Sequence, residues 1–195
     1  MNKVFGKKTD FAPIKEDASR VIISYGYQEV DEENATWFEI YLYKKQISQI
    51  TLADVKDAII KDIDSQTDEK ILCGYEWTIL HGDPAKPKKQ RLIGETVKVW
   101  LSRENQDNFK EAHRLACIDA SAVIPVKFKI NEDENKKAIY ENFESFEELN
   151  QFYLGAFAYI KQNCLDAGWV TKDSIDWAPY EEFFPAPEEN ANQSE

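Results

Sequence analysis

His113 and Cys117 are the two residues whose types and spacing best fit chemistry in this sequence. Four residues apart, they would share one face of a helix, and Cys73 could supply a third metal ligand. Zinc accepts imidazole and thiolate ligands at such spacing. However, no Cys-x-x-Cys or His-Glu-x-x-His pattern completes a zinc shell, and Phe109 and Ala116 fall on the same helical stripe. We therefore predict that His113 and Cys117 pack at the edge of a core, and that the protein has no metal ligands.

A catalytic nucleophile needs a neighbouring base, and this sequence offers few. Its two histidines are His81, beside a Gly-Asp-Pro turn, and His113. Neither Gly-x-Ser-x-Gly nor a papain-type or caspase-type signature is present. We predict no catalytic and no cofactor-binding residues. A small cytoplasmic enzyme that uses Cys117 and His113 remains an alternative.

Nucleic acid is a second alternative partner. No Gly-x-Gly-x-x-Gly or Walker pattern is present to hold phosphates. The 36 acidic and 24 basic residues give a net charge of −12, which opposes binding to a phosphate backbone. We favour a solvated connection over 81–91, in which proline and lysine discourage edge pairing. The residues that could bind nucleic acid weakly are Lys86, Lys88, Lys89 and Arg91, with Trp77 and Trp100 to stack bases.

The composition indicates a folded protein in a reducing compartment. The 195 residues are 43% hydrophobic and 13% aromatic, enough to build a core without disulfides. The three cysteines are odd in number and widely spaced, which favours free thiols. The N-terminus lacks the apolar stretch of a signal peptide, and the longest apolar run, 152–160, is too short to cross a membrane.

Three segments carry apolar residues at the three- and four-residue spacing of a helix. They follow Thr51, Ser102 and Ser145, each a hydroxyl residue that can cap a helix. Ser145 and Glu148 form the full capping-box pattern, and we expect the third helix to end at Gly168. The inner faces consist of Leu52, Val55, Ile59 and Ile63; then Phe109, Ala112 and Ala116; then Leu149, Phe152, Ala156, Ile160 and Cys164.

Paired strand patterns precede each of these helices. Lys127 and Lys129 alternate with apolar residues, which predicts a sheet with one wet face. We predict an α+β fold with a mainly antiparallel sheet and about three helices packed on one side, in the order β-β-α repeated three times. The predicted pairs are 21–30 with 37–43, across the acidic turn 31–34; 75–79 with 97–101; and 124–130 with 139–143.

Five motifs in order resemble an uncharacterised domain family of phages and prophages, found near tail-fibre genes and common in Bacteroides-type hosts. They extend over about residues 51–177. The sequence departs from the family pattern between Trp77 and Val99, where relatives turn quickly and this chain inserts a Pro/Lys-rich loop. The motifs are Ile63-Asp64-x-x-Thr67-Asp68-x-x-Ile71-x-x-Gly74-Tyr75-x-Trp77; Val99-Trp100-Leu101-Ser102-x-Glu104-Asn105-Gln106-x-Asn108-Phe109-x-x-Ala112; Ile124-Pro125-Val126-x-Phe128-Lys129; Phe143-x-Ser145-x-Glu147-Glu148-Leu149-x-x-Phe152-Tyr153; and Gly168-Trp169-x-x-Lys172-Asp173-x-Ile175-Asp176.

The resemblance implies a phage-derived, tail-associated protein without a known reaction, so it transfers no catalytic residue. We expect a non-enzymatic structural or assembly protein that docks to other phage structural proteins or to itself, with no membrane partner. It would reside in the virion, or in the host cytoplasm during assembly.

Structural roles are expected for the motif residues, because each motif lies where two elements join. The expected roles are burial for Trp100, capping of the turn after the first helix for Thr67 and Asp68, positive φ for Gly74, and hydrogen bonds to the neighbouring hairpin backbone for Asn105 and Gln106.

We expect three regions: 1–50 as an N-terminal β-hairpin arm or extension of the sheet, 51–177 as the tail-associated domain, and 178–195 as an acidic, flexible tail. Trp177 and Tyr180 should fold back onto the domain, because four exposed aromatics would form an apolar patch. Phe183 and Phe184, flanked by glutamates and prolines, are the candidate partner contacts. From Glu188 onward, the chain has too little apolar surface to offset the entropy of ordering.

Overall fold

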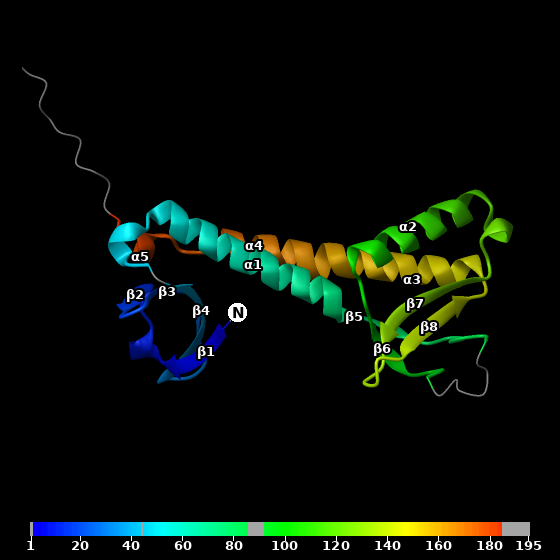
Figure 1. Cartoon of the computed structure of the whole chain (residues 1–195), viewed down its shortest axis with the longest axis horizontal. Helices are drawn as coiled ribbons and strands as arrows, with labels where there is room; N and C mark the ends of the chain where they lie inside the picture. The colour runs from blue at the N-terminus through cyan, green and yellow to red at the C-terminus, as the bar shows by residue number, and fades with distance from the viewer. Residues whose placement is uncertain (1, 44, 86–91, 185–195) are drawn as a thin grey trace, which may run out of the picture. The chain divides into compact units, whose positions relative to one another are not determined.

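The computed structural model describes residues 2–43, 45–85 and 92–184 (Figure 1). The chain divides into two compact units, one formed by residues 1–66 with 169–195 and the other by 67–168. Helix α1 (Leu52–Gly74) supplies residues to both. This division differs from the expected regions 1–50, 51–177 and 178–195. The first 50 residues share a core with α1, and the chain returns to that core after residue 169.

The N-terminal unit contains an antiparallel sheet of four strands in the order β1-β4-β3-β2. The hairpin of β3 (Arg20–Glu29) and β4 (Asn34–Tyr43) confirms the predicted pair. Asp31 closes its turn, since one carboxylate oxygen accepts hydrogen bonds from the amides of Glu33 and Asn34 at 2.9 and 2.8 Å. The edge strands β1 (Asn2–Lys7) and β2 (Ile14–Asp17) were not predicted, because they are short and mostly polar.

The core of this unit forms where one face of the sheet meets α1. Ile23 of β3 is fully buried together with Val55 and Ile59 of α1, as the spacing of the apolar residues predicted. Tyr180, in the short helix α5 (Ala178–Glu181), is buried in the same core and donates a hydrogen bond to the Ser24 carbonyl at 2.7 Å. Trp177 packs there too, which confirms that these two aromatics fold back. The tail from Glu188 onward lies outside the described residues.

In the residues that the structure describes, the second unit contains two strand pairs and helices α2 (Arg103–Ile118) and α3 (Phe146–Ala158), together with the end of α1 (Figure 1). The pairs are β5 (Tyr75–Thr78) with β6 (Thr96–Val99), and β7 (Val126–Glu132) with β8 (Ala138–Phe143). A π-helical turn (Tyr159–Asp166) extends α3 and leads into α4 (Ala167–Asp173).

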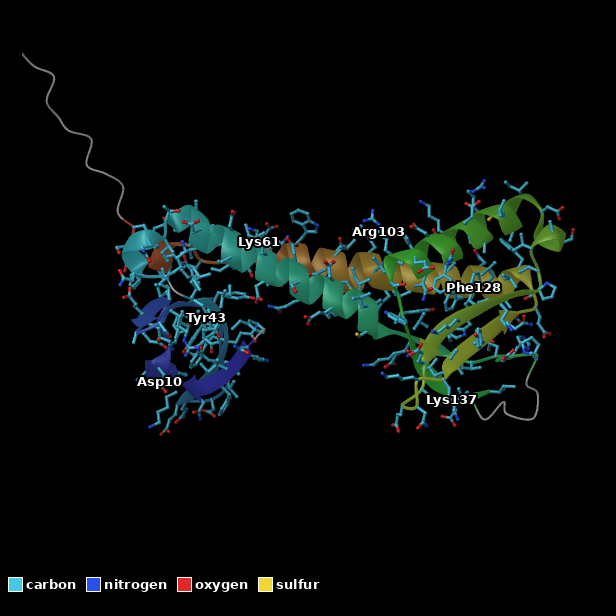
Figure 2. All side chains as sticks on the ribbon, viewed as in Figure 1. Asp10, Tyr43, Lys61, Arg103, Phe128 and Lys137 are labelled. Atoms are coloured by element: carbon cyan, nitrogen blue, oxygen red, sulfur yellow. The ribbon has the colours of Figure 1, made fainter. Side chains whose placement is uncertain are left out.

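Phe152 of α3 lies at the centre of this second core. Its ring meets those of Phe109 and Trp77 edge to face, with centroids 5.0 and 5.1 Å apart. Phe128, labelled in Figure 2, extends from β7 and packs against Phe109 at 5.0 Å. One face of the β7–β8 pair is therefore covered by helices, as its alternating pattern predicted.

These features confirm the α+β fold with antiparallel strands. The prediction of a single sheet was wrong, because the described strands form separate sheets of four, two and two strands. The β-β-α order is preceded by β1 and β2 and followed by further helices. Within the described ranges, no helix is both long and apolar enough to span a membrane.

Glycines permit close approach between the junction of α1 with β5 and the helix formed by α3 and its extension. An ideal Cβ on Gly155 would lie 2.2 Å from the Tyr75 hydroxyl, and one on Gly74 would lie 1.5 Å from that of Tyr159. The Tyr159 hydroxyl instead donates a hydrogen bond to the Lys70 carbonyl at 2.9 Å. Gly74 does not adopt the expected positive φ, so its role is to leave space for a tyrosine.

Two predicted helix ends were wrong for the same reason. Thr67 and Asp68 lie inside α1 rather than in a turn after it, and Gly168 lies inside α4 rather than at a helix end. Gly168 is buried against Thr67, whose hydroxyl would lie 2.7 Å from an added Cβ. Tertiary packing thus uses these small residues within helices, where local signals indicate a stop.

Replacing Gly155 with alanine tests this close approach. Overpacking costs about 1–3 kcal/mol, whereas alanine in place of glycine stabilises a helix interior by about 1 kcal/mol. We expect Gly155→Ala to lower the free energy of unfolding by up to about 2 kcal/mol in chemical denaturation. With Tyr75→Phe added, the clashing hydroxyl is gone and part of the loss should be recovered, relative to Tyr75→Phe alone. A double variant no better than the sum of the two single changes would contradict this contact.

Candidate functional site

The predicted pair His113 and Cys117 does lie on one face of α2, packed against α3. His113 Nε2 is 2.8 Å from Asn150 Oδ1, and the imidazole stacks on Tyr153 with centroids 4.2 Å apart. Cys117 Sγ is 3.9 Å from His113 Nδ1 and 4.0 Å from His113 Nε2. In the part of the chain that the structure describes, no three His, Cys, Asp or Glu side chains are arranged to hold a metal, so Cys73 supplies no third ligand.

Cys117, His113 and Asn150 therefore form a row of thiol, imidazole and amide, the same sequence of groups that some enzymes with a cysteine nucleophile use. The almost equal distances from Cys117 Sγ to both nitrogens place the sulfur away from the in-plane lone pair of either one. Cys117 also lies in the last turn of α2, where the helix dipole disfavours a negative thiolate. This geometry fits packing better than proton transfer between Cys117 and His113.

A second constellation, which sequence reasoning missed, surrounds the carboxylate of Glu141 on β8. The residue is fully buried, with 0% of its surface exposed. Its two oxygens accept five hydrogen bonds at 2.7–3.0 Å, and the donors are the Trp77 indole and the backbone amides of Leu80, His81, Gly82 and Asn142. Three of these amides are consecutive, and Gly82 adopts φ +66°, which favours glycine.

His81 lies beside this carboxylate with its ring turned toward the start of α3. His81 Nε2 is 3.0 Å from Glu148 Oε1, and Nδ1 is 3.8 Å from Glu144 Oε1. The hydrogen bond with Glu148 raises the pKa of His81, although partial burial opposes it, and the charges of Glu148, Glu144 and Glu141 raise this pKa further by smaller amounts. Although burial alone would raise the pKa of Glu148, the hydrogen bonds from His81 and from backbone amides lower it.

A signal for this constellation exists in the sequence. Ile139, Glu141 and Phe143 alternate along β8, so Glu141 occupies a position that faces the core. An acidic residue at such a position needs several donors. The donors come from a segment about 60 residues earlier, and no local pattern identifies them. The Gly-Asp-Pro turn beside His81 indicates solvent, and this local pattern contains no sign of the two carboxylates that contact the ring.

The Glu141 site can hold backbone rather than perform acid–base chemistry. Its lone pairs are directed at an indole and at amides that do not exchange protons in catalysis. Its role is to fix the segment that follows β5. The candidate nucleic-acid contacts Lys86, Lys88, Lys89 and Arg91, beyond that segment, lie outside the described residues.

The other residues for which contacts were predicted belong neither to the Glu141 site nor to the His113–Cys117 pair. Trp100 was expected to be buried, but 45% of its surface is exposed, and the neighbouring Leu101 fills the core instead. Asn105 and Gln106 do bond to backbone, at the carbonyls of Trp100 and Leu101 at 2.7 Å. Phe183 is exposed, whereas Phe184 is half-buried against the core of the N-terminal unit.

No family model, curated protein or solved structure matches this chain.

The Glu141 site predicts a large loss of stability for an isosteric change. In Glu141→Gln the amide nitrogen replaces an oxygen that accepts either the Trp77 indole and the Leu80 amide or the amides of His81, Gly82 and Asn142, so at least two N–H groups lose their acceptor. We expect the free energy of unfolding to fall by about 2–4 kcal/mol, measured by urea denaturation. Glu144→Gln, at an exposed position nearby, is the matched control and should change stability by less than about 0.5 kcal/mol. Similar small effects for both variants would show that the carboxylate charge is not required.

Proposed function

We propose that this protein is a non-enzymatic docking component of a phage or prophage particle, associated with the tail or tail fibre, which acts by binding other phage structural proteins. The resemblance of five sequence motifs to a phage tail-associated family motivates the proposal. The position of the motif tryptophans supports a binding role.

The observation that carries the binding role is the exposure of Trp100 and Trp169. They expose 45% and 62% of their surface, whereas Trp37 and Trp77 expose 2% and 7%. An indole left in water contributes little to the fold, because its transfer from water to the core is incomplete. Tryptophan and tyrosine are the residues most enriched where a few contacts dominate protein–protein binding.

Around Trp100, the second unit presents an aromatic–lysine strip of Trp100, Lys129, Tyr140 and Lys127. Lys129 pairs with Tyr140 across β7 and β8, and its ammonium lies 6.0 Å from the centre of the Trp100 ring system. The Lys127 ammonium lies 4.8 Å from the centroid of Tyr140. Lysine stems against aromatic rings hold the rings in place and reduce the entropy lost on binding.

The proposal is tested by measuring binding to the tail proteins encoded beside this chain. Each purified neighbour would be titrated against wild type, Trp100→Ala and Trp169→Ala by calorimetry. We expect at least one neighbour to bind, and at least one tryptophan variant to raise its Kd by about fivefold or more, with unchanged melting temperature. Tyr43→Ala is the matched control, since Tyr43 (labelled in Figure 2) is an aromatic with 64% exposure outside the motifs. The proposal fails if no neighbour binds, or if all three variants bind like wild type.

The alternative of a thiol enzyme rests on the Cys117–His113–Asn150 row and has its own test. Cys73 and Cys117 are both exposed, whereas Cys164 is buried. An activated thiolate alkylates quickly at neutral pH. We expect iodoacetamide to label Cys117 and Cys73 at comparable rates, resolved by peptide mass spectrometry. A Cys117 rate more than about tenfold above that of Cys73, lost in His113→Ala, would favour the enzyme.

A further inference from the structure

Two parts of the second unit that are distant in sequence meet at the His81 side chain. One is the segment after β5, residues 79–85, and the other is the first turn of α3. We infer that His81 is a pH-sensitive latch that ties this segment to the N-terminus of α3 more tightly when its ring is protonated. This inference goes beyond the proposed docking function and does not depend on it.

The backbone at His81 is held in place independently of its ring. The amides of Leu80, His81 and Gly82 donate to the buried Glu141 carboxylate at 2.7, 2.9 and 3.0 Å. The β-carbon of His81 therefore stays in one position while the ring gains or loses a proton. Any change on titration is confined to the contacts that the ring makes.

Those contacts are with two carboxylates, and both favour the charged ring. In the neutral ring, one nitrogen carries a hydrogen, and Glu148 at 3.0 Å from Nε2 takes it. The other nitrogen, Nδ1, then presents a lone pair toward Glu144 at 3.8 Å. Protonation turns Nδ1 into a donor, so a repulsive contact becomes attractive and the bond to Glu148 becomes charge-assisted.

Glu148 passes this change on to α3, because it is also the capping residue of that helix. Its second oxygen accepts from the amides of Glu144 and Ser145 at 2.8 and 3.2 Å, while the Ser145 hydroxyl accepts from the Glu148 amide at 3.3 Å. One carboxylate thus serves His81 and the capping box together. A stronger hold on Glu148 restrains the first turn of α3.

Among the described residues, the carboxylates near His81 favour the protonated ring and come from several elements. Glu148 belongs to α3, Glu144 precedes it, and Glu141 belongs to β8. Asp83, in the same segment as His81, forms an ion pair with Lys127 at 3.2 Å. The pKa of His81 is raised in the folded protein, so the latch stabilises fully below the ordinary value of about 6.5. That stabilisation is lost as the pH rises through the higher folded value.

His113 provides an internal control within the same protein. Its Nε2 is 2.8 Å from the neutral amide of Asn150, and its ring stacks on Tyr153. Neither Asn150 nor Tyr153 has a carboxylate. The sequence contains two histidines. A titration of the histidine rings therefore follows His81 beside its carboxylates and His113 beside the Asn150 amide in the same sample.

The experiment is an NMR titration of the two histidine rings in the full chain between pH 5 and 9. We expect the His81 midpoint to lie above the ordinary value of about 6.5, and to fall in Glu148→Gln and in Glu144→Gln while the His113 signal stays unchanged. Asn150→Asp, which adds a carboxylate beside His113, should leave the His81 midpoint unchanged. A His81 midpoint at or below about 6.5, or one unmoved by both Glu148→Gln and Glu144→Gln, would overturn the inference.

Amide exchange tests the latch itself and separates it from a simple charge effect. At pH 6, His81→Gln should lower protection in the first turn of α3 by roughly twofold to fivefold, the range expected for a partly exposed ion pair. Above the His81 midpoint the two proteins should exchange alike. His113→Gln should leave the α3 first turn unchanged at both pH values. Equal protection in wild type and His81→Gln at pH 6 would show that His81 titrates without acting as a latch.

Discussion

Burial of the Glu141 carboxylate is the constraint on which the second unit depends. Moving an ionised carboxylate out of water costs several kcal/mol even after relaxation. Here the cost is offset by five donors, an indole and four amides. These donors come from β5, from the segment after it and from β8 itself. The strand pairs are thus specified relative to each other by one polar centre as well as by the aromatic core around Phe152.

The N-terminal unit also buries a carboxylate, but a cation is among the donors that stabilise it. Glu39 on β4 is nearly buried and accepts hydrogen bonds from Lys15, Trp37 and Tyr41 at 3.0, 3.1 and 2.8 Å. Although burial alone would raise the pKa of Glu39, these donors lower it, with Lys15 contributing most. A cation from the edge strand β2 neutralises this carboxylate, so the contact also holds the edge of the sheet. In both units an indole N–H completes the shell.

Local patterns predicted the helices well because their signals act over one turn. Ser102 and Ser145 cap α2 and α3 through the amides of Asn105 and Glu148, as their spacing indicated. The inner faces of these helices and of α1 were also confirmed, except that Ala112 is only half-buried and lies outside the core. The helix ends predicted near residues 67 and 168 were wrong, because Gly168 packs against Thr67 inside the helices and no local pattern shows this contact. Alternation along a strand could not decide which of Trp100 and Leu101 enters the core once the strand had ended at Val99. The Glu141 and His81 contacts needed pairings about 60 residues apart, which no local pattern contains.

The π-helical turn over Tyr159–Asp166 sets the rotation of the residues that follow it about the helix axis. Its wider turns bring residues five apart toward one side, so Tyr159 can reach the Lys70 carbonyl while Cys164 remains buried. Each residue advances an α-helix by about 100°. Inserting or deleting a single residue in this turn would rotate Gly168 away from Thr67 and direct a larger side chain at the threonine. Length variation in relatives of this chain should therefore occur outside these eight residues, even though the turn itself breaks the regular helix.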